Sequence, residues 1–232
     1  MKSQPRGLII LDAVTLLAIA IATYMVFGYA PVEAVMGLVQ KVFYFHVAAG
    51  WVGMLGYLAA VVAGIAYLIT RNTNWDLVGM GAIEIGLTFM LVNIVTGSIW
   101  ARPIWNTWWT WDPRLTTATI MELVYAAYLM LRSGIEDPDR RARFAAVYAI
   151  VGFISVPLTF FSIRIYRTIH PVIIGSGDPT VSGSFSMTPA MGLTFGISLA
   201  AFSILFASLL WHRIRLGQLS QRVEQLRMRV TQ

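Results

Sequence analysis

The sequence predicts an all-α fold: a polytopic membrane protein of six transmembrane helices with a tryptophan-rich loop on the outer side. Three observations support this fold class. Hydrophobic residues make up 57% of the 232-residue chain, charged residues make up 12%, and the mean hydropathy is +0.69, whereas a soluble domain carries about 25% charged residues. Six apolar runs approach or exceed the roughly 20 residues that cross a bilayer. The basic residues lie between these runs and form no continuous stripe, which argues against a nucleic-acid partner.

The first predicted span covers residues 8–30 and has one alternative interpretation. The triplet Ala18-Ile19-Ala20 resembles the cleavage site of a secretory signal peptide. The apolar run continues through Phe27, however, which is longer than the apolar core of a typical signal peptide. We therefore predict an uncleaved span, and under either interpretation the chain lies outside at Pro31.

The other spans are predicted at residues 42–70, 77–99, 116–131, 145–162 and 189–211. The runs at 116–131 and 145–162 are short, so we expect their helices to extend into the neighbouring loops. Thr188-Pro189 is typical of a helix start, with Thr as the N-cap and Pro at the first helical position. No internal repeat is visible, so residues 1–212 are predicted to form one transmembrane domain.

Residues 213–232 form a basic tail with apolar residues at spacings of 3, 4, 3 and 4: Leu216, Leu219, Val223, Leu226 and Val230. This pattern is too short to predict a long coiled coil. A basic amphipathic helix on the anionic inner surface, with membrane lipid as its partner, is the first interpretation. A docking face for a cytoplasmic protein is the second.

The orientation in the membrane follows from the distribution of Lys and Arg. If all six runs cross, twelve Lys and Arg residues lie on one side and five lie on the other. Basic residues concentrate in short cytoplasmic loops. Both termini are therefore predicted to be cytoplasmic, and the loop between the third and fourth spans faces outward.

That loop holds five of the eight tryptophans within twelve residues: Trp100, Trp105, Trp108, Trp109 and Trp111. Tryptophan offers a large flat apolar face with one N–H donor at its edge. The cluster therefore predicts a platform for a flat, apolar ligand. The alternative is an aromatic belt at the membrane surface, although such belts usually distribute their aromatic residues over many helix ends.

Two of the three histidines lie on the predicted outer side. His46 lies just over one turn into the second span, and His170 lies in the connection between the fifth and sixth spans. His212 lies on the inner side, where an interfacial anchor explains it. An ionisable group within a span suggests a functional site. Taken singly, His46 is also consistent with a hydrogen-bonded core residue and His170 with a polar loop residue; beside the tryptophan loop, a joint role is favoured.

Haem is the ligand that uses all of these features. It takes two axial nitrogens, aromatic surfaces for its faces, and cations for its propionates, which Arg102, Arg114, Arg164 and Arg167 could supply. A bare metal ion usually needs three or four ligands. The chain has no cysteine, which excludes thiolate metal sites and covalent attachment of haem to this chain.

The segment VTGSIWARPIWNTWWTWDPRLT, residues 95–116, resembles the WWD signature of haem-handling membrane proteins, and the whole chain resembles the CcmC family of cytochrome c maturation. Tyr44-Phe45-His46-Val47 is similar to the first outer histidine motif of that family, and Arg167-Thr168-Ile169-His170 is similar to the second. Pro113 stands where the family often has a small residue; proline suits a position at a helix start.

This resemblance implies that His46 and His170 are the axial ligands of a non-covalently held haem b, the transported ligand, and that the WWD loop, residues 97–117, lies against it. The haem-binding residues it implies are His46, His170, Trp100, Trp105, Trp108, Trp109, Trp111, Asp112 and Arg114. It also implies a location in the plasma (inner) membrane and three partners: a CcmE-type haem chaperone, a CcmAB-type ATP-binding transporter unit and a CcmD-type small membrane protein.

The predicted function is haem binding and delivery to the periplasmic chaperone for c-type cytochrome biogenesis, without catalysis. One alternative is a component of a cytochrome c haem lyase, which the chain length disfavours because the larger relatives carry additional histidines. Another is a secondary transporter of a different small molecule, for which we would expect inverted repeats or paired broken helices. Among the carboxylates within spans, Glu122 is predicted to support the tryptophan loop, with a packing role as the alternative.

Overall fold

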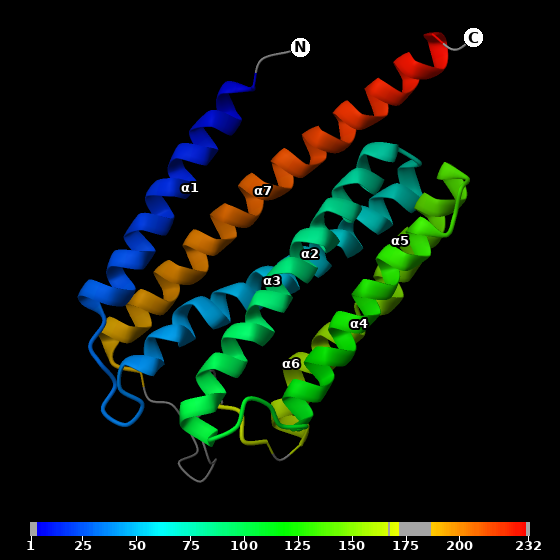
Figure 1. The fold of residues 1–232 in the computed structure, drawn as a ribbon. Helices are drawn as coiled ribbons and strands as arrows, with labels where there is room; N and C mark the ends of the chain where they lie inside the picture. Colours follow the sequence, from blue (N-terminus) through cyan, green and yellow to red (C-terminus); the bar gives the residue numbers. More distant parts are fainter. Residues whose placement is uncertain (1–3, 167, 172–186, 231–232) are drawn as a thin grey trace.

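The computed structural model describes residues 4–166, 168–171 and 187–230, and helices joined by turns and loops make up its secondary structure, with no strand among these residues. The predicted all-α class is confirmed. Short π-helical and 3₁₀ segments, η1 (Met25–Tyr29) and η2 (Leu38–Lys41), separate the first two long helices. The α-helices are α1 (Arg6–Tyr24), α2 (Val42–Thr70), α3 (Thr73–Trp105), α4 (Pro113–Ser133), α5 (Pro138–Gly152), α6 (Ser155–Ile165) and α7 (Pro189–Val230) (Figure 1).

Within the described part of the chain, five helical segments are long and apolar enough to cross a membrane: Arg6–Tyr29, Leu38–Thr70, Thr73–Trp105, Pro138–Ile165 and Pro189–Val230. The protein is therefore a multi-pass membrane protein. The predicted fourth span exists as α4, a helix of 21 residues, but it is not among these five. Its threonines and the charged Arg114, Glu122 and Arg132 lower its hydropathy. The prediction of six spans is thus only partly confirmed.

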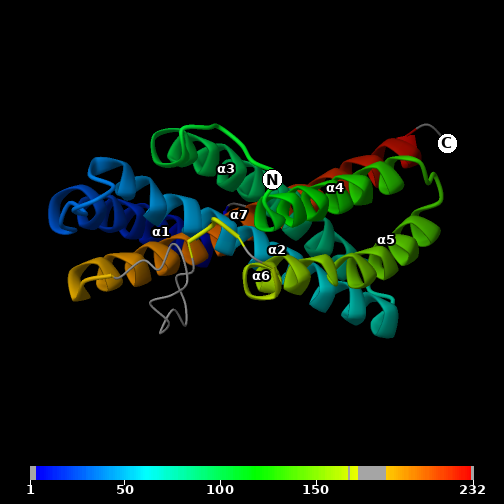
Figure 2. The same cartoon turned by 90° about the horizontal axis from the view of Figure 1, so that it is seen from below.

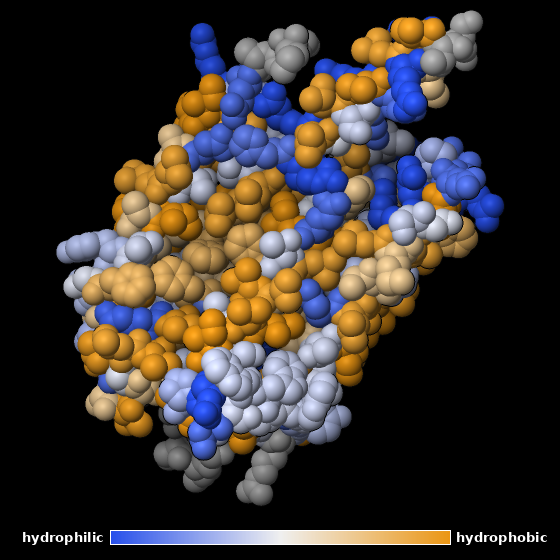
Figure 3. All heavy atoms as spheres, viewed as in Figure 1, coloured by the Kyte–Doolittle hydropathy of each residue, from blue (hydrophilic) through white to orange (hydrophobic). Residues whose placement is uncertain are grey.

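The described chain ends, at α1 and α7, lie at the same end of the molecule (Figure 1). The turns between α2 and α3 and between α4 and α5 lie at that end as well. The loops that follow η1, α3 and α6 lie at the opposite end, which we call the loop end. A broad apolar band separates the two more polar ends on the face shown in Figure 3. Figure 1 and Figure 2 agree that α1 and α5 lie at opposite edges of the bundle.

The helix starts follow from ordinary capping chemistry. Asn72, Asp112 and Asp137 each precede a helix and accept a hydrogen bond from a backbone N–H in its first turn. Such a bond satisfies one of the donors that a helix start leaves unpaired. Pro113 and Pro138 occupy the first helical positions of α4 and α5, where a missing N–H costs nothing.

Helices α2 and α3 form the tightest pair in the bundle. At Gly56 an added Cβ would lie 2.6 Å from the carbonyl oxygen of Ala82, so the close approach requires glycine. Tyr57 stacks on Tyr125 of α4, with ring centroids 3.6 Å apart, and its hydroxyl donates to Glu122 at 3.1 Å. The described hydrogen bond of Glu122 is therefore with Tyr57 in the core and not with the tryptophan loop. This favours the packing role.

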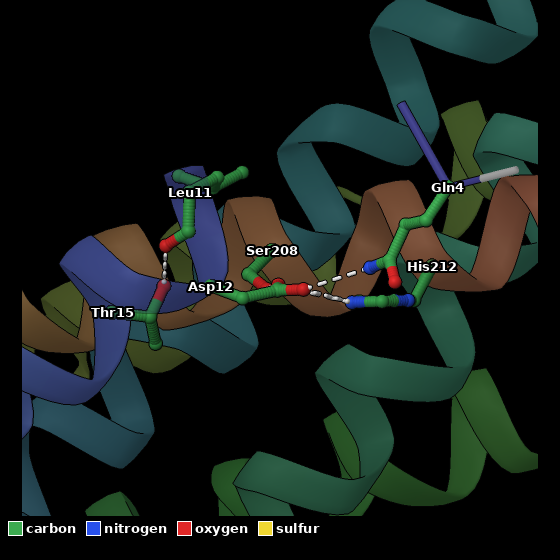
Figure 4. Close-up of polar contacts among 6 residues, drawn as sticks. All are labelled: Gln4, Leu11, Asp12, Thr15, Ser208 and His212. Atoms are coloured by element: carbon green, nitrogen blue, oxygen red, sulfur yellow. Dashed lines mark hydrogen bonds and ion pairs between the residues drawn. The ribbon is translucent and has the colours of Figure 1, made fainter. Parts of the chain in front are cut away.

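A cluster of polar side chains connects α1 to α7 (Figure 4). Asp12 accepts a hydrogen bond from Ser208 at 2.6 Å and lies 3.0 Å from Nε2 of His212, while Gln4 donates to its other oxygen at 3.0 Å. His212 therefore has a specific partner within the protein, beyond the interfacial role expected from the sequence. These bonds fix α1, which otherwise packs mainly through apolar contacts.

The predicted tail, as far as residue 230, is the continuation of α7. The helix runs without interruption for 42 residues from Pro189 to Val230. Its last turns project past the turns at the same end of the bundle (Figure 1).

Candidate functional site

A cavity of about 330 Å³ lies at the loop end, between α2, α3, α4, α6 and α7, and its lining is mainly apolar. The predicted site residues that line it are His46, His170, Trp100, Trp105, Trp108, Trp109 and Arg114. Trp111 and Asp112 do not line it. Segments separated by more than 120 residues in the sequence thus contribute to one cavity.

His46 is held by α3. Its Nδ1 lies 2.9 Å from the backbone carbonyl oxygen of Asn93. Because a carbonyl only accepts, Nδ1 carries the proton and Nε2 carries the lone pair. The amide nitrogen of Asn93 lies 3.4 Å from this Nε2. The side-chain amide of Asn93 donates to the His46 carbonyl at 2.7 Å. Gly97 lies against the ring, since a Cβ there would be 2.9 Å from Cε1 of His46.

His170 has the same tautomer by a similar contact. Its Nδ1 lies 3.1 Å from the carbonyl oxygen of Pro171, and its backbone N–H donates to the hydroxyl of Thr168 at 3.0 Å. Burial, followed by the positive charge of Arg114 and the neighbouring His46, lowers the pKa of His170 to about 3. The imidazole is therefore neutral at physiological pH, which is the form that ligates a metal.

The tryptophans form two edge-to-face pairs around the cavity. The ring centroids of Trp100 and Trp105 are 5.1 Å apart, and those of Trp109 and Trp111 are 5.8 Å apart. Edge-to-face contact is a favoured arrangement of aromatic rings. Trp108 lines the cavity although 59% of it is exposed, and Trp111 is 75% exposed and supports Trp109 from outside.

Asp112 connects the tryptophan loop to the loop that carries His170. As the N-cap of α4, it accepts a hydrogen bond from the backbone N–H of Arg114 at 2.9 Å. The same carboxylate accepts from the hydroxyl of Thr168 at 2.7 Å and from the backbone N–H of Ile169 at 3.0 Å. Asp112, predicted as a ligand-binding residue, therefore acts on the site by holding the segment that precedes His170.

Arg114 is the predicted propionate-binding cation that lines the cavity. Its guanidinium donates a hydrogen bond to the carbonyl oxygen of Thr159 in α6, which keeps the charge at the cavity wall. The predicted loop 97–117 is shorter in the structure, because α3 continues to Trp105 and α4 begins at Pro113. Arg102, in the last turn of α3, donates to its C-cap Asn106. Arg164 is exposed at the end of α6, and Arg167 lies outside the described residues.

The sequence argument missed Asn93, Gly97 as a ring contact, and the aromatic pair Phe43 and Phe195, whose rings stack with centroids 5.5 Å apart beside the cavity. Asn93 had a usable signal, since an amide within an apolar span is unusual. Within the described ranges, no group of three or more His, Cys, Asp or Glu could hold a bare metal ion. The arrangement fits a metal-containing ligand whose own atoms supply most of the ligands to the metal.

The chain is similar to known proteins over most of its length. The family profile described as "Heme exporter protein C" matches residues 2–229. The "Heme exporter protein C" of Bradyrhizobium diazoefficiens is 32% identical over 220 residues, covering 94% of this chain and 81% of the relative. Its counterpart in Rhodobacter capsulatus is 30% identical, with coverage of 99% and 93%. The Escherichia coli K12 protein of the same name is 29% identical, with coverage of 82% and 74%. The chain belongs to the heme exporter protein C (CcmC) family.

Proposed function

We propose that this protein binds haem at its loop end and delivers it to a periplasmic haem chaperone for c-type cytochrome biogenesis. One observation carries the proposal. Two histidines from distant segments line the same tryptophan-walled cavity, and each has its Nδ1 engaged by a backbone carbonyl. In this tautomer the Nε2 of each histidine carries the lone pair that can ligate a metal. At His46 the ligand would replace the long contact of Nε2 with the Asn93 amide, at 3.4 Å. The relatives' name, heme exporter protein C, supports the choice of haem.

In this proposal His46 and His170 are the axial ligands, and the tryptophans that line the cavity cover the faces and edge of the porphyrin. Arg114 neutralises a propionate, because its charge is held at the cavity wall. Trp111 and Asp112 support the loop. A non-covalent haem b is the form consistent with a chain that has no cysteine and with a role in transfer.

We further propose that α4 crosses the membrane as a sixth span. At about 1.5 Å per residue, its 21 residues extend for about 32 Å, and it runs between the two ends of the bundle beside α5 and α6 (Figure 1). With the Lys and Arg distribution, this crossing puts both termini in the cytoplasm and the cavity outside the inner membrane. The CcmE-type chaperone would then reach the cavity from the periplasm, with CcmAB-type and CcmD-type subunits as further partners.

The first experiment is an absorption spectrum of the protein purified with haem, followed by mixing with the haem-free chaperone. We expect a six-coordinate, low-spin spectrum typical of two imidazole ligands, and transfer of haem without any change in its vinyl groups. A spectrum without imidazole ligation would contradict the proposed site. Formation of thioether bonds by the purified protein would instead support a haem lyase activity.

A further inference from the structure

The C-terminal part of α7 extends beyond the rest of the bundle. A bilayer's hydrocarbon core takes about 20 helical residues, whereas α7 has 42. Its last described contacts with other helices are those of Gly217, packed under Leu77 of α3, and Gln218, which donates to Asn74 at 3.3 Å. From Leu219 to Val230 every residue is exposed. Since α7 has about twice the length needed to cross, we place this segment, about 18 Å long at 1.5 Å per residue, in water beyond the bilayer.

An apolar stripe follows this projecting segment. The side chains that form it, which we call the tail stripe, are between 50% and 86% exposed: Leu216, Leu219, Val223, Leu226 and Val230. Their alternating spacing of three and four residues places them on one face of the helix. A row of large apolar side chains in water is typical of a surface that another protein covers.

The charges beside the tail stripe determine what can cover it. With Leu216, Val223 and Val230 at the a positions of a heptad, the flanking e and g positions hold Arg215, Ser220, Arg222, Arg227 and Arg229. In a coiled coil these positions face those of the partner helix. A second copy of this chain, parallel or antiparallel, would oppose arginine to arginine. A helix with Glu or Asp at its e and g positions would meet opposite charges.

The membrane surface is a less suitable partner. An amphipathic helix on a membrane lies in the plane of the bilayer, whereas the tail continues the direction of the spanning part of α7 without interruption. The bidentate ion pair of Arg213 with Glu84 and the contact of Gln218 with Asn74 connect α7 to α3 at the start of the stripe. These contacts set the direction of the tail away from the bilayer.

We propose that residues 216–230 of α7 dock an acidic amphipathic helix of a partner protein, forming a short two-stranded coiled coil on the side of the C-terminus. This inference does not depend on haem binding. It depends on the projection of α7, the exposed tail stripe and the arginines on both of its flanks.

The test uses the full-length protein in nanodiscs of phosphatidylcholine. The probe is a fluorescent three-heptad peptide with Leu at its a and d positions and Glu at its e and g positions. A matched peptide carries Lys at e and g. We expect saturable binding of the acidic peptide and at least tenfold weaker binding of the basic one. The Arg222→Glu/Arg229→Glu variant should bind the basic peptide more tightly than the acidic one. This reversal would show that the flanking charges select the partner.

Variants of the helix itself provide the controls. Leu219→Ser/Leu226→Ser should weaken binding of the acidic peptide at least tenfold, while Gln221→Ser/Gln225→Ser, on the opposite face, should leave it unchanged. Both variants should keep the wild-type far-UV circular dichroism spectrum and thermal unfolding midpoint, which shows that the membrane domain is folded. Equal binding of both peptides, or binding unaffected by the loss of Leu219 and Leu226, would overturn the proposal.

Two further outcomes would also overturn it. The first is a dimer through the tail, seen by light scattering and abolished by Leu219→Ser/Leu226→Ser. The second is insertion into lipid, seen as a blue shift of an environment-sensitive dye on Val223→Cys when anionic lipid is added to the nanodiscs. We expect a monomer and no such shift.

Discussion

The orientation of His46 is the residue-scale feature on which the site depends most. Its ring lies between the Asn93 carbonyl, which fixes the tautomer, and Gly97, which leaves room for the ring. Groups that orient a metal-ligating histidine typically change metal affinity by about 10- to 100-fold when they are altered. On the proposed function, α3 would therefore contribute to haem binding by orienting His46.

Gly97→Ala should weaken haem binding about tenfold or more, because the new Cβ would lie 2.9 Å from Cε1 of His46 and displace the ring. The matched control is Gly196→Ala in α7, where a Cβ would meet nothing within 4 Å. Both substitutions raise helix propensity by about 1 kcal/mol. Haem titration of the purified variants measures the effect, and equal affinities for the two would contradict this role of Gly97.

Trp108 and Trp109 line the cavity from the loop, and Trp108 is 59% exposed. Replacing both by Ala should leave some haem bound, because two axial nitrogens would remain, and should abolish transfer to the chaperone. Haem content and transfer kinetics are measured on the same preparation. Unimpaired transfer would reduce the loop to an interfacial belt, and complete loss of haem would make it part of the primary site.

At the residue scale, the sequence predicted residues with distinctive chemistry. Histidines and tryptophans are few and their clustering is visible in the chain, so His46, His170 and four cavity-lining tryptophans could be named. The hydrogen bonds of Asp112 to Thr168 and Ile169, and of Asn93 to His46, connect segments about 50 residues apart. No local sequence pattern predicts such pairings, because they arise from how the helices pack.

At the scale of elements, the start of α4 holds the site together. Its N-cap, Asp112, both begins the helix and fixes the segment before His170. One side chain therefore couples the position of the tryptophan loop to that of the second histidine.

Asp112→Ala should therefore produce a haem spectrum like that of a protein lacking the His170 ligand, with five-coordinate or weakly bound haem. The matched control is Asp137→Ala, which removes the N-cap of α5. Each variant loses about 1 kcal/mol of helix-capping stability, so thermal stability should fall in both. Only Asp112→Ala should change the spectrum. A normal spectrum in this variant would mean that Asp112 is only a cap.

The element boundaries were predictable where a single physical signal dominates. The bounds of α2 agree with the predicted residues 42–70, and α7 begins at Pro189 as its Thr-Pro signal indicates. The fifth predicted span is two helices, α5 and α6, because the α-helix gives way to turns at Phe153 and Ile154. Gly152 and Pro157 flank that break, which is a typical signal of a helix end, but the length of the apolar run alone does not reveal it.

At the scale of the whole molecule, the account requires that both histidines lie in one compartment. The absence of cysteine allows a test with single cysteines at exposed positions. A membrane-impermeant thiol reagent added outside intact cells should label Val35→Cys and Tyr166→Cys, at the loop end, and should not label Asp139→Cys or Gln225→Cys. Labelling of Asp139→Cys without Tyr166→Cys would mean that α4 does not cross the membrane.

The central claim is that His46 and His170 ligate the same haem iron, and the most direct measurement is the absorption spectrum of each histidine variant. We expect His46→Ala to lose most of its haem, because a ligand held within α2 and oriented by α3 is pre-positioned. We expect His170→Ala to retain some five-coordinate haem, and added imidazole to restore a six-coordinate spectrum. Wild-type spectra in both variants would contradict the shared haem site.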